Sequence, residues 1–323
     1  MRLQPALLAL SLVLALCFSA GQAMAQEPPG EEEEIVALGE REGPRVWRVL
    51  NGDKELVILG GLSPLPKGVT WRSRTVETLI SDSQLVMPTT ASITFPEIGP
   101  FKAIGLLFAV RKESKAEEGV LLRDAISPEL YARYTALRRK YGGPDSWDKL
   151  RPIAAAGKVA EAAFEAASIR DFGLNAEIAK IAKKKKRPWK PETVAFRGNA
   201  KALVKEVSEK ARPLEEACLR ETLDVVEKDL PLLRRRAAAW AAGDVAALSR
   251  LPRPQQAKSC QAIVFSSEAL AGLREEGVKK VRARMFAALE TNAHTFVVTN
   301  IDELLFGDLL ASFEAKGYRV IRP

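Results

Sequence analysis

Residues 46–61 read VWRVLNGDKELVILGG, and this stretch decides the fold. Two short apolar runs rich in β-branched residues, 46–50 and 55–59, are separated by Asn-Gly-Asp at 51–53. An Asn-Gly pair between such runs is typical of a tight turn, because both residues tolerate a positive φ. The sequence therefore predicts that the folded part of the chain opens with a β-hairpin.

The pattern after the hairpin alternates between helix and strand. A proline-rich loop at 63–68 leads to a predicted helix over 73–83 and a strand over 85–87. This order is typical of an α/β domain whose helices pack on a sheet. We expect two further strands, 91–95 and 103–110, because both runs are short and apolar.

The middle of the chain has a helical pattern. Residues 128–211 are rich in Ala, Lys and Glu, and two helices, 213–229 and 231–242, are expected to follow. Pro231 separates these two, because proline fits a first helical turn but lacks the amide needed inside a helix.

Strands return at the carboxyl terminus. A strand at 294–299, a helix at 301–315 and a strand at 318–321 end the chain. The predicted fold class is therefore α/β (α+β): a sheet formed by amino- and carboxy-terminal strands, with a large helical insertion over about 128–290.

The first 25 residues (1–25) have the organisation of a cleavable signal peptide. Arg2 precedes an apolar stretch over 6–18, and a small-residue cleavage site, Ala-Met-Ala, ends this segment. The apolar stretch is 13 residues long, too short to span a bilayer. We expect an exported protein, periplasmic or secreted, without a transmembrane span. Residues 26–43 contain four consecutive glutamates and predict a flexible acidic leader before a domain over 44–323.

Two cysteines remain once the predicted signal peptide, with Cys17, is removed. Cys218 and Cys260 are 42 residues apart, and disulfides persist in oxidising compartments. We expect the two to pair, which by the chain-entropy model stabilises the fold by about 4 kcal/mol. The alternative is two buried free thiols.

The chain is basic, with a formal net charge of +8, and its most pronounced cluster is a cationic run. The run comprises Lys183, Lys184, Lys185, Lys186 and Arg187. One interpretation is a solvated helix end, where cations complement the helix dipole. The other is contact with anionic lipid head groups, acidic polysaccharide or an acidic protein partner. Export argues against nucleic acid as the partner.

Three segments together resemble a known family. The first is the hairpin start VWRV at 46–49, leading into LGGLSPLPKGVTWRS at 59–73; the second is AWAAGD at 239–244. The third is TFVV at 295–298, followed by a helix and KGYRV at 316–320. In their order and spacing the segments resemble the TraB/GumN family, to which the Tiki metalloproteases are similar, over about 44–323.

The resemblance implies a metal site whose ligands this chain lacks. The family carries Gly-x-x-His after the first hairpin, a glutamate ending the next strand, and a glycine-rich histidine motif near the carboxyl terminus. Here the first motif begins at Gly60 and ends at Ser63, the glutamate position is Pro88, and Glu303 replaces the second histidine. We therefore expect a catalytically inactive relative of metal-dependent hydrolases, without a cofactor, that binds or supports something in the cell envelope.

An active hydrolase remains the alternative. Asp302 and Glu303 could hold a hard divalent cation through oxygen, together with another acid from the helical region. The competing interpretation is a capping box between Asn300 and Glu303 at a helix start. The single histidine, His294, and Ser63 form the available imidazole and hydroxyl pair for nucleophilic catalysis. No nucleophile elbow frames that serine, and a strand-end role is expected for His294.

Overall fold

The computed structural model describes residues 43–69, 71, 74–170, 173–253 and 257–323. The predicted signal peptide, and the predicted leader up to residue 42, lie outside these residues.

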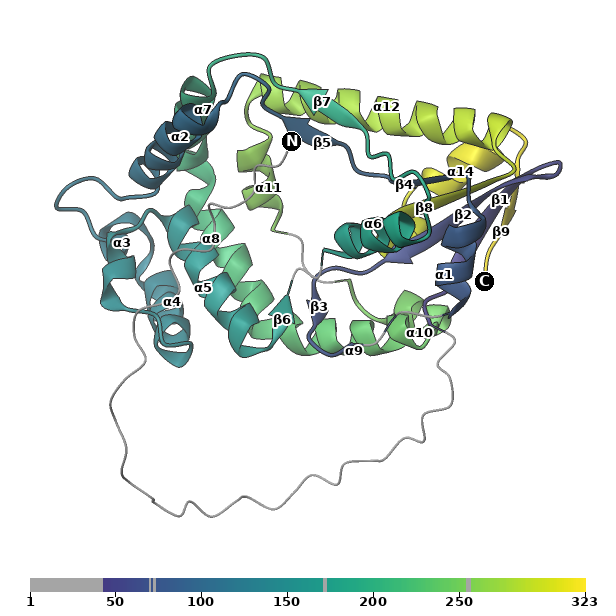
Figure 1. The fold of residues 1–323 in the computed structure, drawn as a ribbon. Helices are drawn as coiled ribbons and strands as arrows, with labels where there is room; N and C mark the ends of the chain where they lie inside the picture. The colour runs from purple at the N-terminus through teal and green to yellow at the C-terminus, as the bar shows by residue number, and fades with distance from the viewer. Residues whose placement is uncertain (1–42, 70, 72–73, 171–172, 254–256) are drawn as a thin grey trace, which may run out of the picture. The chain divides into compact units, whose positions relative to one another are not determined.

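A five-stranded sheet joins the two ends of the described chain, in the order β4-β8-β2-β1-β9 (Figure 1). The amino-terminal strands are β1 (Val46–Asn51), β2 (Lys54–Gly61) and β4 (Leu85–Pro88), and the carboxy-terminal strands are β8 (His294–Asn300) and β9 (Arg319–Ile321). β1 pairs antiparallel with β2 and β9, which confirms the hairpin, whereas β8 runs parallel to β2 and β4. The predicted fold class is confirmed.

The central strands are apolar because helices cover both faces of the sheet. Leu56, Ile58 and Phe296 are fully buried in the main hydrophobic core. A side chain on Gly60 would collide with Ile301 of α13 (Ile301–Phe306), and one on Gly61 would collide with Leu174 of α6 (Leu174–Lys184). Successive strand residues point to opposite faces, so α13 and α6 cover opposite faces of β2.

The predicted helical insertion is confirmed, and part of it has a second hydrophobic core. Leu130, Tyr134, Leu219 and Leu223 are buried there together. The helices between β4 and β8, besides α6, are α2 (Pro100–Glu113), α3 (Leu122–Ala125), α4 (Pro128–Lys140), α5 (Pro152–Ala166), α7 (Ala200–Ala211), α8 (Glu215–Asp224), α9 (Leu230–Ala241), α10 (Val245–Arg250), α11 (Lys258–Val264) and α12 (Glu268–Thr291).

Two short strand pairs accompany the insertion. β3 (Leu65–Pro66) pairs with β6 (Ile169–Arg170), and β5 (Ser92–Thr94) pairs with β7 (Thr193–Ala195). The predicted strand at 91–95 is therefore present, but its partner lies in the region predicted to be helical.

The predicted strand at 103–110 is wrong, because this segment lies inside α2. Its large apolar residues recur at helical spacing, at Phe101, Ile104, Leu107 and Phe108. Pro100 at the first turn also favours a helix start. The run was too short and too uniformly apolar for its composition to separate helix from strand.

Two helix boundaries also differ from the prediction. The segments before and after Pro231 are joined through a π-helical turn, Val225–Asp229, rather than by a break. A π turn changes the hydrogen-bond pattern just where the proline lacks an amide. The helix expected over 301–315 is divided at Gly307 into α13 and α14 (Leu309–Glu314).

The predicted disulfide is confirmed. Cys218 of α8 and Cys260 of α11 are joined, with a Cα–Cα distance of 4.7 Å. Ser259, next to Cys260, also donates hydrogen bonds from its amide and its hydroxyl to Glu221 of α8, both at 2.8 Å. The bridge and these bonds hold α11 against α8.

Candidate functional site

The carboxyl ends of three parallel strands meet at one edge of the sheet. Gly61 at the end of β2 is in register with Asn300 at the end of β8, and Pro88 at the end of β4 is in register with Val298. Ser63 follows β2 by two residues, and Glu303 follows β8 by three. The fold therefore brings the sequence-predicted positions Gly60, Ser63, Pro88 and Glu303 to this edge, where parallel α/β sheets commonly bind ligands.

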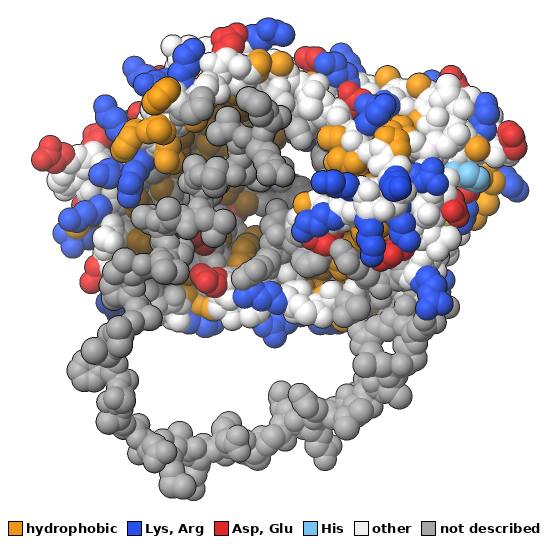
Figure 2. Space-filling view, in the orientation of Figure 1, with side chains coloured by type: hydrophobic (Ala, Val, Ile, Leu, Met, Phe, Trp, Pro, Cys, Tyr) orange, Lys and Arg blue, Asp and Glu red, His pale blue; other side chains and the backbone are white. Residues whose placement is uncertain are grey.

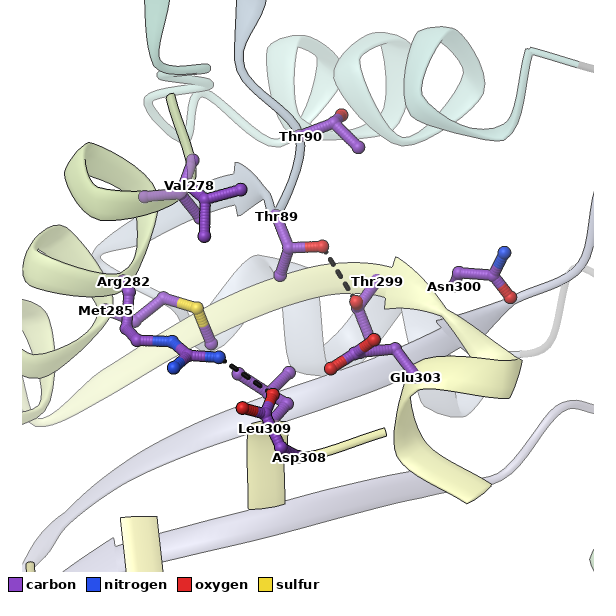
Figure 3. A pocket seen from close by; sticks show the side chains of 11 residues that line it. Thr89, Thr90, Val278, Arg282, Met285, Thr299, Asn300, Glu303, Asp308 and Leu309 are labelled. Carbon is purple, nitrogen blue, oxygen red and sulfur yellow. Dashed lines mark hydrogen bonds and ion pairs between the residues drawn. The ribbon is translucent and has the colours of Figure 1, made fainter. Parts of the chain in front are cut away.

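A cavity of about 370 Å³ opens at this edge, between the ends of β4 and β8 and the helix α12 (Figure 3). One wall is apolar and carries Val278, Val281, Met285 and Leu309. The polar groups come from the strand ends and the following helices: Thr89, Thr90, Arg282, Thr299, Asn300, Glu303 and Asp308.

Glu303 contributes a carboxylate without a partner among the described residues. Its side chain lines the cavity and folds back toward Gly307, where its Oε1 lies 2.5 Å from the place a Cβ would occupy. Any larger residue at position 307 would displace this carboxylate. A half-buried, unpaired carboxylate is a group that a cation or a hydrogen-bond donor on a ligand can satisfy.

The other polar groups of the cavity pair with one another. The Thr89 hydroxyl donates a hydrogen bond to the Thr299 hydroxyl at 2.7 Å, and Arg282 forms an ion pair with Asp308 at 2.9 Å (Figure 3). The Asp308 side chain is 73% exposed, so this ion pair contributes little to stability.

Asp302 does not share the cavity with Glu303. Its carboxylate forms an ion pair with Arg236 of α9, whose side chain is completely buried. Neighbouring helical residues point in different directions, and Asp302 holds α13 against α9. The two adjacent acids proposed as joint metal ligands are therefore separated by their contacts.

Asn300 caps α13, as expected, but in a different way. Its side-chain oxygen accepts a hydrogen bond from the amide of Asp302 at 2.9 Å. The reciprocal contact of a capping box, from Glu303 back to the cap residue, is not formed in the part of the chain that the structure describes. Glu303 is thus directed to the cavity rather than to the helix end.

His294 and Ser63 lie toward opposite ends of the parallel strands. His294 begins β8 beside Glu55, with its Nδ1 3.0 Å from that carboxylate. The register from Glu55 to Gly61 covers the length of β2, which at the rise of a strand is roughly 20 Å. These two residues cannot act as a nucleophile and its base, and His294 has the strand-end position predicted for it.

One contact between distant parts of the chain had no signal in the sequence. The indole Nε1 of Trp240 donates a buried hydrogen bond to the carbonyl of Gly60 at 2.6 Å. Trp240 also contacts the ring of Trp71, with 6.0 Å between ring centroids. Two of the segments that resemble the TraB/GumN family, 59–73 and 239–244, are therefore in contact near the end of β2.

The cationic run lies at the carboxyl end of α6. Lys183 and Lys184 end the helix, Lys185 lies 3.8 Å from Glu77, and Lys186 has a left-handed backbone. The run thus has the place expected of a helix end whose cations complement the dipole. Figure 2 shows the surface over α6 crowded with Lys and Arg side chains.

A family model describes almost the whole folded chain. The TraB/PrgY/gumN family model matches residues 45–322. The chain belongs to the TraB/PrgY/gumN family. No curated protein and no solved structure is similar enough to count as a match. Membership in the TraB/PrgY/gumN family rests on the match of this model over the sheet and the whole insertion.

The residues at the strand edge do not fit the metal site that the resemblance to the TraB/GumN family implies. Pro88 offers no ligand atom, and a serine hydroxyl at position 63 is a poor one for a divalent metal. Asp302 is held by Arg236. Over the described residues, no group of three or more His, Cys, Asp or Glu side chains is arranged to hold a metal ion.

Proposed function

We propose that this protein is an exported, non-catalytic member of the TraB/PrgY/gumN family that binds or supports a component of the cell envelope. The observation that carries the proposal is the chemistry at the shared strand edge. Ser63, Pro88 and Glu303 stand where the family resemblance places metal ligands, and Glu303 is the one carboxylate among them. A single carboxylate does not supply the three protein ligands that a catalytic zinc normally takes.

The cavity at the edge supports a binding role. It combines an apolar wall with hydroxyl groups and the unpaired Glu303 carboxylate, which is the usual make-up of a small-molecule site. The Thr89–Thr299 hydrogen bond orients two of the hydroxyl groups that line it.

Two features support the proposed export. Residues 1–25 have the composition of a signal peptide, and the Cys218–Cys260 disulfide suits an oxidising compartment. Within the described ranges, no helix combines the length and the apolar character needed to cross a bilayer. Cell fractionation with amino-terminal sequencing tests this part: we expect Gln26 to be the first residue of the exported protein, and an intact amino terminus in the cytoplasm would contradict it.

Metal analysis and a peptidase assay test the loss of catalysis. The purified protein, supplied in turn with Zn²⁺, Mn²⁺ and Co²⁺, is expected to bind no metal stoichiometrically and to cleave no peptide above background. Glu303→Gln serves as the matched variant and should be indistinguishable. Stoichiometric metal with turnover that this substitution abolishes would establish the alternative, a metal-dependent hydrolase with carboxylate ligands.

The cationic run supports a second candidate function, binding of anionic envelope components. Lys183, Lys184 and Lys186 are exposed and make no ion pair with any described residue. Replacing residues 183–186 by Gln is expected to remove salt-sensitive binding to an acidic polysaccharide. Unchanged binding would leave these lysines with the helix-end role alone.

A further inference from the structure

α2 presents an apolar face to solvent. Phe101 is 90% exposed, Leu107 67%, Phe108 65% and Ile104 55%. The four recur at helical spacing on one side of α2, and we call them the α2 apolar face. Monomeric soluble proteins rarely leave such a contiguous surface uncovered unless something binds to it.

The opposite side of α2 already has its partner. Gly105, Leu106 and Ala109 are half-buried, and α2 packs on α7 beside it (Figure 1). The Lys201 ammonium of α7 lies 3.1 Å from the position of a Cβ on Gly105. α2 is therefore apolar around most of its circumference but covered on one side only. Helices that are apolar all round are normally buried or in contact with lipid.

Three cations lie at the carboxyl end of the α2 apolar face, and two of the acids beside them, Glu113 and Glu117, already have partners. Arg111, Lys112 and Lys115 are exposed and make no ion pair with any residue the structure describes. Glu113 accepts a hydrogen bond from the Ser208 hydroxyl at 2.5 Å, and Glu117 pairs with Arg212 at 3.0 Å. Figure 2 shows hydrophobic side chains with Lys and Arg around them over the region of α2 and α7.

We propose that the α2 apolar face inserts into the interface of an anionic phospholipid bilayer, while Arg111, Lys112 and Lys115 contact the lipid phosphates. A helix of 14 residues is about 21 Å long, and it would lie in the membrane plane with the α2 apolar face toward the acyl chains and its other side still packed on α7. The inference deepens the proposed function, on which it rests, by naming the envelope component that the protein binds.

Charge favours lipid over a second copy of the chain. A two-fold contact would join two copies of the same patch, and with them the surplus positive charge that Arg111, Lys112 and Lys115 give each copy. Anionic head groups instead neutralise them, and each Lys or Arg near such a surface strengthens binding by about 1 kcal/mol.

Vesicle flotation tests the proposal. The purified protein, its amino terminus defined by mass spectrometry, is mixed with vesicles of phosphatidylcholine containing one quarter phosphatidylglycerol, or with phosphatidylcholine alone. We expect binding to the anionic vesicles, and weaker binding at high salt. The Leu107→Gln/Phe108→Gln variant should bind at least about tenfold more weakly, because less apolar area enters the interface. The Lys112→Gln/Lys115→Gln variant should lose about fivefold in affinity for the anionic vesicles for each lysine replaced.

A matched control carries the same chemical change at exposed apolar residues elsewhere. Val264→Gln/Ile321→Gln alters side chains that are 48% and 41% exposed and should bind like the wild type. If the Leu107→Gln/Phe108→Gln variant does not fold, Phe101→Gln replaces it, since that side chain is the most exposed.

Three outcomes overturn the inference. They are no binding to anionic vesicles, equal binding by the α2 variant, and a dimer in sedimentation that the α2 substitutions dissociate. The last would assign the face to a second copy. The metal and peptidase measurements involve no lipid. A negative vesicle result therefore does not contradict the proposed loss of catalysis, and a positive peptidase result does not contradict membrane binding.

Discussion

Two aspartates near the carboxyl terminus, each paired with an arginine, allow a sharp test of what Asp302 does. Asp302 pairs with the completely buried Arg236, and Asp308 pairs with Arg282, whose side chain is 38% exposed. The two acids are close in sequence and belong to the same type of pair. They differ mainly in burial, so the cost of removing each carboxylate measures the role of burial directly.

Asp302→Ala is expected to destabilise the protein by about 3 kcal/mol. Removing one partner of a buried pair costs about 3–5 kcal/mol, because the remaining charge is left without compensation. The lower end applies here, since the Asp302 side chain is itself 25% exposed and water can reach the vacated site. Asp308→Ala should cost less than about 1 kcal/mol, as for other exposed pairs.

Urea unfolding followed by tryptophan fluorescence measures both values, because Trp240 lies on α9 four residues after Arg236 and is buried in the main core. Asp302→Asn, which keeps an acceptor for Arg236, should fall between the wild type and the alanine variant. Equal losses for Asp302→Ala and Asp308→Ala would refute the reasoning. A wild-type midpoint that rises with Mn²⁺, and does so only while Asp302 is present, would assign the carboxylate to a metal instead.

Three further predictions concern stability. Replacing both Cys218 and Cys260 by Ala should lower the free energy of unfolding by about 2–4 kcal/mol, and dithiothreitol should lower the wild-type midpoint to match. Gly61→Ala should lower the free energy of unfolding by about 1–3 kcal/mol through overpacking, because its Cβ would lie 2.3 Å from Leu174 Cδ2. In a Leu174→Ala background, thermal melts should show no such further loss from Gly61→Ala, because the clashing atom is gone. Burial raises the pKa of Glu215 despite an adjacent arginine, so the folded state binds this proton more readily than the unfolded state. Stability relative to Glu215→Gln should therefore be greatest below the ordinary glutamate pKa of about 4.3 and fall as pH rises above it; a constant difference between pH 4 and 7 would contradict this.

Local pattern and chemistry predicted much of the fold. The Asn-Gly turn fixes the hairpin between β1 and β2, because the turn residues and the alternating strand pattern act over a few residues. The disulfide was predicted from the two cysteines outside the predicted signal peptide and from the oxidising compartment that the predicted export implies. The family was also accessible from short segments, since the order of LGGLSPLPKG, AWAAGD and TFVV along the chain is specific.

Segments whose composition suits either state required the tertiary structure. The run 103–110 is as apolar as a strand, yet it is part of α2 and exposes much of its apolar surface. The helix at 231–242 begins through a π turn rather than after a break. Taken by itself, a short apolar run fits both helix and strand, and the helical spacing becomes clear only when Phe101 before the run is included. A π turn is a change in backbone hydrogen bonding, which the spacing of side chains does not report.

The sequence by itself determined the residue types at the three motif positions, Ser63, Pro88 and Glu303. It thereby determined that the metal ligands implied by the family resemblance are absent from these positions. Only the tertiary structure decided how the neighbouring acids are used. Asp302 and Glu303 are adjacent in the chain, but Arg236 holds the first against α9 while the second lines the cavity. The partner that separates them is 66 residues away, and contacts over such distances depend on packing, which no local pattern encodes.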